Sequence, residues 1–420
     1  IFPENIVPKV ILANTYLSTN RNDEAIAIYS EIIKDKPEFA SSYYDLGRAY
    51  LMTDKQDEAI SMYQNMIGVD SKSISGRLAL AGVLIKQGDA EKAAKMLSDV
   101  IALEPENLIA HNLLGKVSLA EKNFEKAESE FTKMIELRSD TFEGHFNMAR
   151  MKFAQGDFDK CIEHCKKALE TRPVDVRIHN ILGMAYMRKG LIKDAVFEFN
   201  KIIDINSDFV PAFLNLANIN IAAKKPDIAA LLYKAALKVK PDTVEARFGL
   251  GNSYALMGKY SESVTEFDSI IKEYPNNVNV YISLAKSYMA MDDNIKAHEA
   301  ITNALSIETD NPTARSVLAK IYVGNEDMPQ AISQLKRVLS KNQKLLNVYD
   351  LGILYIDIEE YENAIFTYEQ GVENFPENSL LWYNLAVAYQ INKDYKGARE
   401  ACTKALSFQP DGTVANLCML

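Results

Sequence analysis

The chain has 420 residues, a formal net charge of −10, and 48% hydrophobic and 25% charged residues. This balance is ordinary for a globular protein and excludes wholesale disorder and the fibrous classes. An acidic chain is a poor match for nucleic acid, whose phosphates are bound through clustered Lys and Arg. No apolar run approaches the length of about 18 residues that a membrane span requires. We therefore expect neither a nucleic acid partner nor a transmembrane segment.

A 34-residue period runs through the chain and aligns Tyr50, Tyr254, Tyr288 and Tyr389. We number the positions of each repeat from 1, with the first repeat starting at residue 6. Position 8 is Gly or Ala in every repeat, and position 20 is Ala in ten of them. The predicted repeats, which make a single array of the whole chain 1–420, are 6–39, 40–73, 74–107, 108–141, 142–175, 176–209, 210–243, 244–277, 278–311, 312–344, 345–378 and 379–412.

Each repeat predicts two amphipathic helices. Positions 4, 7, 8 and 11 fall on one face at helical spacing, and so do positions 20, 24 and 27. Small residues at positions 8 and 20 allow the two helices to approach closely. Polar turns such as Gln87-Gly88-Asp89 separate the helices, and a Pro at position 32 of seven repeats ends the second one. Residues 413–420 resemble the start of a further first helix, so we expect a piece of a longer repeat protein or ends that a partner covers.

Positions 8 and 32 also alternate together. Over the first seven repeats the pair changes between Ala with Pro and Gly with Ser, as in Ala81 with Pro105 and Gly115 with Ser139. We interpret this beat of two repeats as growth by duplication of a two-repeat unit.

The pattern resembles the tetratricopeptide repeat family over residues 6–412. The resemblance implies an all-α fold, a right-handed α-solenoid superhelix of antiparallel helix pairs. It also implies that the first helices line a concave groove that holds an extended peptide or a partner's helix. In that family positions 2, 5, 6, 9, 12 and 13 face the groove.

No catalytic, cofactor or metal motif is present, so we expect no enzyme activity, no cofactor and no metal. His111, His145 and His179 all occupy position 4 of consecutive repeats. Helices pack about 8–10 Å apart, too far for three stacked histidines to share a zinc ion with bonds of about 2 Å. We interpret them as packing residues, and likewise Cys161 and Cys165 at positions 20 and 24.

The groove positions supply the candidate binding residues. Position 9 recurs as a cation or Asn, positions 5 and 6 provide at least one groove Asn in most central repeats, and aromatic residues share position 5. An Asn amide both donates and accepts, so a row of such amides suits the backbone of an extended peptide. The predicted peptide-binding residues are Asn112, Lys116, Asn147, Arg150, Asn180, Asn215, Asn218, Asn252, Phe146, Phe248, Arg48, Lys286 and Lys320.

One groove chemistry is disfavoured. Tetratricopeptide domains that capture a C-terminal carboxylate carry Lys at position 5, and no repeat here does. Chaperone-tail binding is therefore not expected.

The leading hypothesis is a non-enzymatic scaffold that binds a partner polypeptide in its groove within a larger assembly. The composition, rich in Lys, Ile, Asn and Asp, resembles that of bacterial repeat scaffolds, and both the cytoplasm and the bacterial periplasm or envelope remain open. The alternative is a substrate-recognition arm of a protein glycosyltransferase or other multidomain enzyme, which sequence beyond Leu420 would reveal. A third hypothesis is end-to-end self-association.

Overall fold

The computed structural model describes residues 6–340 and 345–409, and every regular element in them is an α-helix. Helices follow in antiparallel pairs, and each pair falls inside one predicted repeat, which confirms the all-α solenoid of about twelve helix pairs. The proposed further helix at 413–420 lies outside the described residues, and the right-handed winding stays a prediction. The helices are α1 Val7–Ser18, α2 Asn22–Asp35, α3 Ala40–Met52, α4 Gln56–Val69, α5 Ile74–Gln87, α6 Ala90–Leu103, α7 Leu108–Ala120, α8 Phe124–Leu137, α9 Phe142–Gln155, α10 Phe158–Thr171, α11 Val176–Arg188, α12 Ile192–Ile205, α13 Val210–Ala222, α14 Pro226–Val239, α15 Val244–Leu256, α16 Tyr260–Glu273, α17 Val278–Met289, α18 Asn294–Ile307, α19 Pro312–Gly324, α20 Met328–Leu339, α21 Leu345–Asp357, α22 Tyr361–Asn374, α23 Ser379–Ile391 and α24 Tyr395–Phe408.

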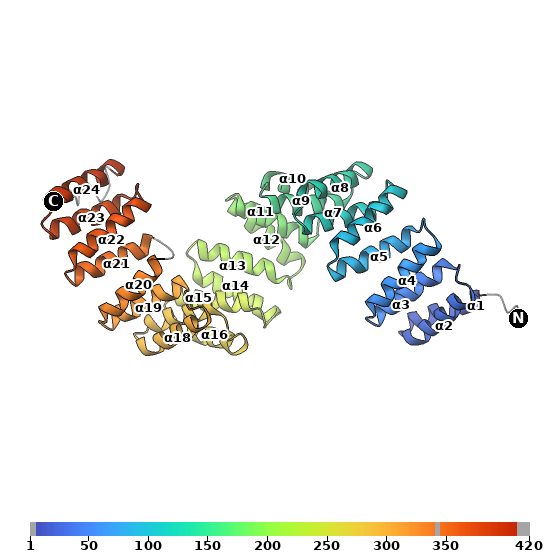
Figure 1. The fold of residues 1–420 in the computed structure, drawn as a ribbon, viewed down its shortest axis with the longest axis horizontal. Helices are drawn as coiled ribbons and strands as arrows, with labels where there is room; N and C mark the ends of the chain where they lie inside the picture. Colours follow the sequence, from blue (N-terminus) through green and yellow to red (C-terminus); the bar gives the residue numbers. More distant parts are fainter. Residues whose placement is uncertain (1–5, 341–344, 410–420) are drawn as a thin grey trace. The chain divides into compact units, whose positions relative to one another are not determined.

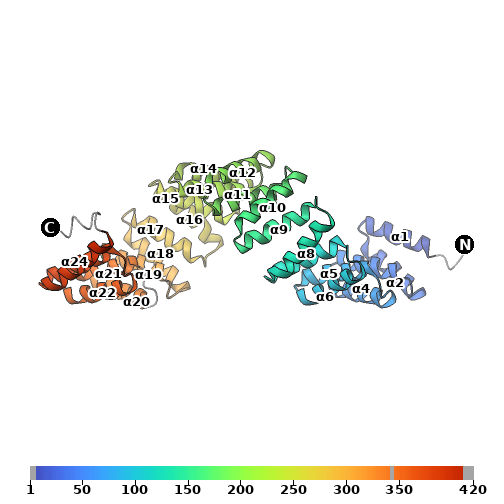
Figure 2. The ribbon, with the colours of Figure 1, turned by 90° about the horizontal axis from the view of Figure 1, so that it is seen from above.

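The chain forms two compact units, residues 1–212 and 213–420, and the boundary falls within α13. Figures 1 and 2 show, within each unit, that a helix lies beside its neighbours in sequence. First helices of successive repeats also touch one another directly, as α7 with α9 and α9 with α11 do in the first unit. The first helices α7, α9 and α11 therefore form one continuous wall in that unit.

One residue in each turn between paired helices adopts the left-handed backbone conformation. Gly88 and Gly156 have φ of +81° and +80°, as expected for residues without a Cβ. The same position of other repeats holds a residue with a side chain, for example Lys122 with φ of +60°. The turn geometry is thus fixed by the repeat length. The identity of the residue changes only the free-energy cost of the left-handed backbone conformation.

Second helices begin with side-chain caps in many repeats. Asp89, Asn123 and Asp157 each accept a hydrogen bond from the backbone N–H three residues later. These caps satisfy donors that have no partner inside the helix. The polar turns seen in the sequence therefore both end one helix and start the next.

The core lies between helices, and its shape explains the small residues at position 8. Gly183 on α11 faces the fully buried ring of Phe199 on α12, and a Cβ on that glycine would lie 2.8 Å from the ring. Where position 8 is Ala81, position 24 carries the smaller Leu97. In these two repeats the choice between Gly and Ala thus has a packing reason, since ring and methyl group compete for one space. Two other repeats do not follow this rule and combine Ala13 with Tyr29 and Ala217 with Tyr233.

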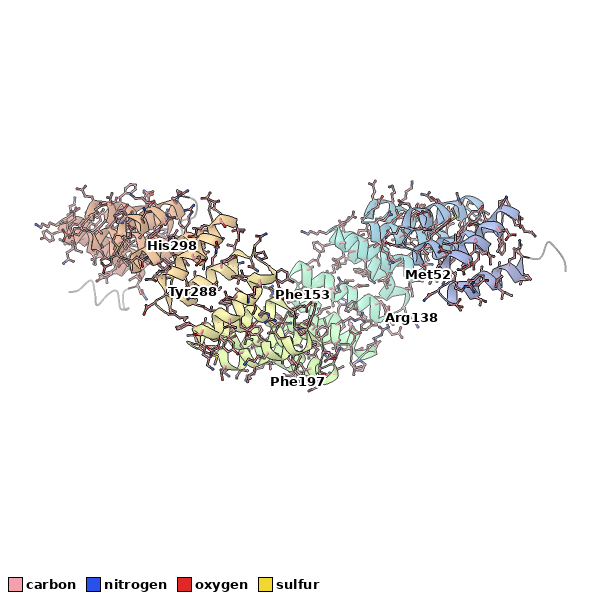
Figure 3. All side chains as sticks on the ribbon, turned by 90° about the horizontal axis from the view of Figure 1, so that it is seen from below. Met52, Arg138, Phe153, Phe197, Tyr288 and His298 are labelled. Atoms are coloured by element: carbon pink, nitrogen blue, oxygen red, sulfur yellow. The ribbon has the colours of Figure 1, made fainter. Side chains whose placement is uncertain are left out.

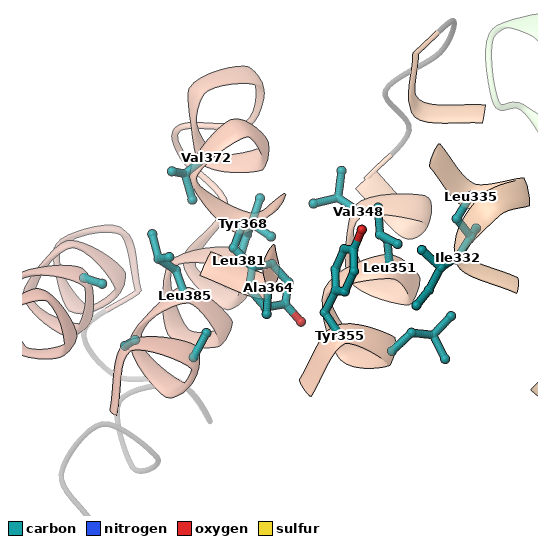
Figure 4. Packing of buried hydrophobic residues seen from close by; sticks show 14 of the residues in the cluster. Ile332, Leu335, Val348, Leu351, Tyr355, Ala364, Tyr368, Val372, Leu381 and Leu385 are labelled. Atoms are coloured by element: carbon teal, nitrogen blue, oxygen red, sulfur yellow. The ribbon is translucent and has the colours of Figure 1, made fainter. Parts of the chain in front are cut away.

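In the second unit the same packing produces a cluster that spans α19 to α24. Tyr355, Tyr368 and Leu381 belong to it and are at most 2% exposed. Figure 4 shows Tyr368 and Tyr355 between aliphatic residues of neighbouring helices. Each repeat therefore gains its core by stacking on the next.

Candidate functional site

The first helices α7, α9 and α11 of the first unit carry the densest set of predicted binding residues. These helices lie side by side, and Figure 1 shows them in teal to green. Asn112 and Lys116 come from α7, Phe146 and Arg150 from α9, and Asn180 from α11. Because the same position of successive repeats recurs on adjacent first helices, residues 34 apart in the sequence are neighbours in space.

Asn147 does not fit the prediction that it contacts a ligand in the groove. It is only 1% exposed, and its Nδ2 donates a hydrogen bond of 2.7 Å to Oδ1 of Asn112 on the neighbouring repeat. Burial favours a polar side chain only when it is bonded, so this amide serves to join α7 and α9. Asn112 itself is half-buried.

Lys116 and Arg150 are exposed, and neither takes part in an ion pair among the described residues 6–340 and 345–409. Partial burial lowers the pKa of Lys116, and the nearby Arg150 charge lowers it further. The neighbouring carboxylate, Glu143, instead pairs with Arg172 at 2.9 Å. The surface is therefore locally positive although the whole chain is acidic.

Aromatic rings and guanidinium groups alternate beside these cations. The rings of Phe142 and Phe146 stack with centroids 5.6 Å apart. Arg172 lies over Phe142 at 4.1 Å, and Arg177 lies over Phe146 at 4.9 Å. Arg150 is 5.8 Å from the Phe146 ring. Such cation–π contacts hold the long arginine side chains against the surface and reduce the entropy they lose on binding a ligand.

We call Lys116, Phe146, Arg150, Arg172 and Arg177 the cationic surface. Sequence analysis identified the first three and missed Arg172 and Arg177. Arg177 occupies position 2, one of the groove positions, and could have been found there. Arg172 lies directly after α10, where no periodic signal marks it.

Further along α9, Phe153 packs edge-on against Phe158 of α10, with centroids 5.6 Å apart. Figure 3 labels this half-buried ring. It therefore contributes to the joint between the two helices of its repeat.

The remaining predicted residues have varied surroundings. Arg48 is exposed and lies 3.6 Å from Asp45, and Lys320 is exposed and lies 3.6 Å from Asp350. Oδ1 of Asn218 accepts a hydrogen bond of 2.5 Å from Tyr233. The Phe248 ring packs on Phe267 with centroids 5.7 Å apart. Lys286 is exposed, whereas three predicted amides are half-buried: Asn180, Asn215 and Asn252. Whether any of these residues binds a ligand stays a prediction.

The position-4 histidines are buried, and each is anchored by two hydrogen-bond contacts. Nε2 of His111 and His179 faces the backbone carbonyl of Pro105 and Pro173, each at 2.9 Å. Nδ1 of the same residues faces Glu130 and Glu198, each at 2.6 Å. These side chains thus tie the loop between repeats to the second helix of their own repeat.

The middle histidine has a different partner. Nδ1 of His145 lies 3.0 Å from Nδ1 of His164. Burial lowers the pKa of both rings. The pKa of His164 falls to about 4, because the neighbouring His145 lowers it further. In this pair one nitrogen must donate and the other accept, so at least the accepting ring must be neutral. Nothing in it offers a metal site, and no group of three His, Cys, Asp or Glu residues that could hold a metal ion occurs in the described residues.

The nearby cysteines are also interior residues. Cys161 and Cys165 of α10 are free thiols with no exposed surface, and the hydrogen-bond contact with Cys161, together with burial, raises the pKa of Cys165. A buried thiol is a poor nucleophile. No helix within residues 6–340 and 345–409 is long and apolar enough to cross a membrane.

Comparison with known families matches the repeats directly. One tetratricopeptide repeat model matches residues 12–68, 146–209 and 214–278, and a second matches 50–117 and 84–145. A model described as the C-terminal ARM domain of tetratricopeptide repeat protein 21 matches residues 257–414. Together the first two models span more than half of the sequence, so the chain belongs to the tetratricopeptide repeat family.

Individual relatives are distant. BBSome complex member BBS4 from Bos taurus is 22% identical over 245 residues, which cover 57% of this chain and 46% of that protein. Protein O-mannosyl-transferase TMTC1 from Homo sapiens is 24% identical over 205 residues, which cover 48% of this chain and 23% of that protein. The crystal structure of the APC/C hetero-tetramer Cut9-Hcn1 matches 97% of this chain and 94% of that chain, with 15% identity and a TM-score of 0.44. The chain thus spans less than half the length of either curated relative.

Proposed function

We propose that this protein is a non-enzymatic scaffold that binds an extended segment of a partner protein on the first-helix surface of α7, α9 and α11. The observation that carries the proposal is the pair of exposed cations Lys116 and Arg150 on adjacent first helices, which have no ion-pair partner among the described residues. A family whose members carry repeats in complexes such as the BBSome supports a role in assembly.

The mechanism is a pre-organised surface. Helix pairs packed on both sides fix the backbone of α9, and the Arg–Phe contacts fix the side chains. A partner segment then loses its own conformational freedom on binding, while the scaffold loses little. The half-buried Asn112 can bond the backbone of the segment, and the cations set which side chains it carries.

The test is capture of a partner by the purified chain and by two charge-reversal variants. Arg150→Glu changes the first-helix surface, whereas Lys166→Glu makes the same change on the second helix of the same repeat. Both residues are exposed, so stability should change by no more than about 0.5 kcal/mol. Loss of the captured protein with Arg150→Glu alone supports the proposal. Equal capture by all three proteins would place the partner on another surface.

A second candidate function is the substrate arm of a protein glycosyltransferase, which the similarity to TMTC1 favours. Sequence beyond Leu420 that predicts a catalytic domain would support it. Continued 34-residue repeats there would favour the scaffold. The bacterial source suggested by composition stays a prediction.

A further inference from the structure

We propose that the cationic surface binds an acidic polypeptide segment in an extended conformation with carboxylates three residues apart. This inference rests on the function proposed above and adds the chemistry and the spacing of the ligand. Three observations support it: the charge of the surface, the distance between its helices and the contacts of its aromatic rings.

The charge of the surface is unbalanced. Four cations gather there, Lys116, Arg150, Arg172 and Arg177, against two carboxylates. Those carboxylates, Glu143 and Asp175, are each within 2.9 Å of a guanidinium nitrogen of Arg172 or Arg177. Two positive charges on neighbouring helices therefore remain without a counter-charge among the described residues. An incoming carboxylate removes this repulsion and gains charge-assisted hydrogen bonds.

The spacing follows from the helix packing. Lys116 and Arg150 occupy the same repeat position on α7 and α9, which are in direct contact. The axes of packed helices lie about 8–10 Å apart. A polyproline II segment rises about 3.1 Å per residue with three residues per turn, so every third side chain recurs on one side after about 9 Å. A β-strand repeats a face every two residues, at about 6.6 Å, and matches less well.

The state of the rings argues against single-stranded nucleic acid as the ligand. Bases bind to proteins of this kind by stacking on aromatic faces. Here Arg172 lies over Phe142 and Arg177 lies over Phe146, and the two rings already stack on each other. The faces of both rings are thus already in contact with other side chains and cannot stack on a base. The unpaired cations instead favour a carboxylate ligand.

The experiment measures binding of four labelled peptides of about twelve residues, four polyproline II turns, to the full chain by fluorescence anisotropy. One peptide carries Glu at every third position, and a second carries the same number of Glu residues at every second position. The third replaces Glu by Gln, and the fourth replaces Glu by Lys. A single-stranded oligonucleotide is measured beside them.

The first peptide should bind about tenfold more tightly than the others, and salt should weaken it. The double variant Lys116→Glu, Arg150→Glu should lose this factor of about ten and gain affinity for the Lys peptide. The matched control is Lys126→Glu, Lys166→Glu, two exposed lysines on the second helices of the same two repeats. It should bind like the unchanged chain.

Several results would overturn the inference. Equal binding of the Glu and Gln peptides, each weakened by Asn112→Ala, would refute the acidic ligand and leave the proposed function standing. Equal binding of the two Glu peptides would refute the three-residue spacing. Tighter binding of the oligonucleotide would assign the surface to nucleic acid. If none of the peptides binds and the oligonucleotide does not bind either, the inference is wrong, and the capture experiment with Arg150→Glu and Lys166→Glu decides the proposed function separately.

Discussion

The contact between Gly183 and Phe199 gives the sharpest test of the packing. A Cβ added at Gly183 would lie 2.8 Å, 2.9 Å and 3.1 Å from three carbons of the Phe199 ring. Carbon atoms pack best at about 3.5–4.0 Å, so the ring or α11 must move by roughly 0.7 Å or more. The ring has no exposed surface and thus no free space to enter.

Two effects then oppose each other in Gly183→Ala. Ala is favoured over Gly inside a helix by about 1 kcal/mol. Overpacking of a filled core costs about 1–3 kcal/mol. We expect the overpacking to exceed the gain, with a net loss of up to about 2 kcal/mol in the free energy of unfolding. Gly82→Ala on α5 is the matched control, because no heavy atom lies within 4 Å of its new Cβ. It should stabilise the chain by about 0.5–1 kcal/mol.

The assay is urea denaturation followed by circular dichroism, together with hydrogen exchange of α11 and α12. The second measurement is needed because a repeat array can unfold in parts. The double variant Gly183→Ala, Phe199→Leu copies the natural pair Ala81 and Leu97 and should be more stable than the sum of its single changes by about 1 kcal/mol. If Gly183→Ala stabilised the chain as much as Gly82→Ala does, the packing argument would be refuted.

Three further predictions follow from other contacts. Because the folded-state pKa of His164 is about 4, below its ordinary value of about 6.5, the unfolded chain alone takes up this proton as the pH falls from 6.5 to 4. Stability should fall by about 1–3 kcal/mol across that range, and His164→Glu, which copies Glu130 and Glu198, should reduce the slope in pH-dependent urea denaturation. Gly88→Ala should cost about 1 kcal/mol, since φ is +81°, whereas Lys122→Gly at the equivalent turn should not destabilise the chain; thermal melts compare the two. Leu182→Ala, at a core position 2% exposed, should cost about 2–5 kcal/mol, yet peptide affinity measured well below the melting temperature should stay unchanged.

The sequence alone determined the helix pairs and the polar turns that separate them. Local rules suffice for these features, because helical periodicity, polar turns and the 34-residue period act over short separations. The turn at Gln87-Gly88-Asp89 separates α5 from α6 as predicted. The burial of His111, Cys161 and Cys165 was predicted for the same reason, since each occupies a core position of a repeating pattern.

The tertiary structure decided which polar residues remain at the surface. Asn112 and Asn147 were both predicted to bind a peptide, yet Asn147 is buried and its amide donates a hydrogen bond to Asn112 of the preceding repeat. Tyr233 likewise bonds Asn218 and packs against Gly249 of the next repeat, although its own repeat has Ala217 at position 8. Such outcomes depend on the volumes and hydrogen-bonding groups of residues from neighbouring repeats, which meet only after stacking. Periodicity assigns a side chain to a face, but its neighbours in space determine whether it remains available to a ligand.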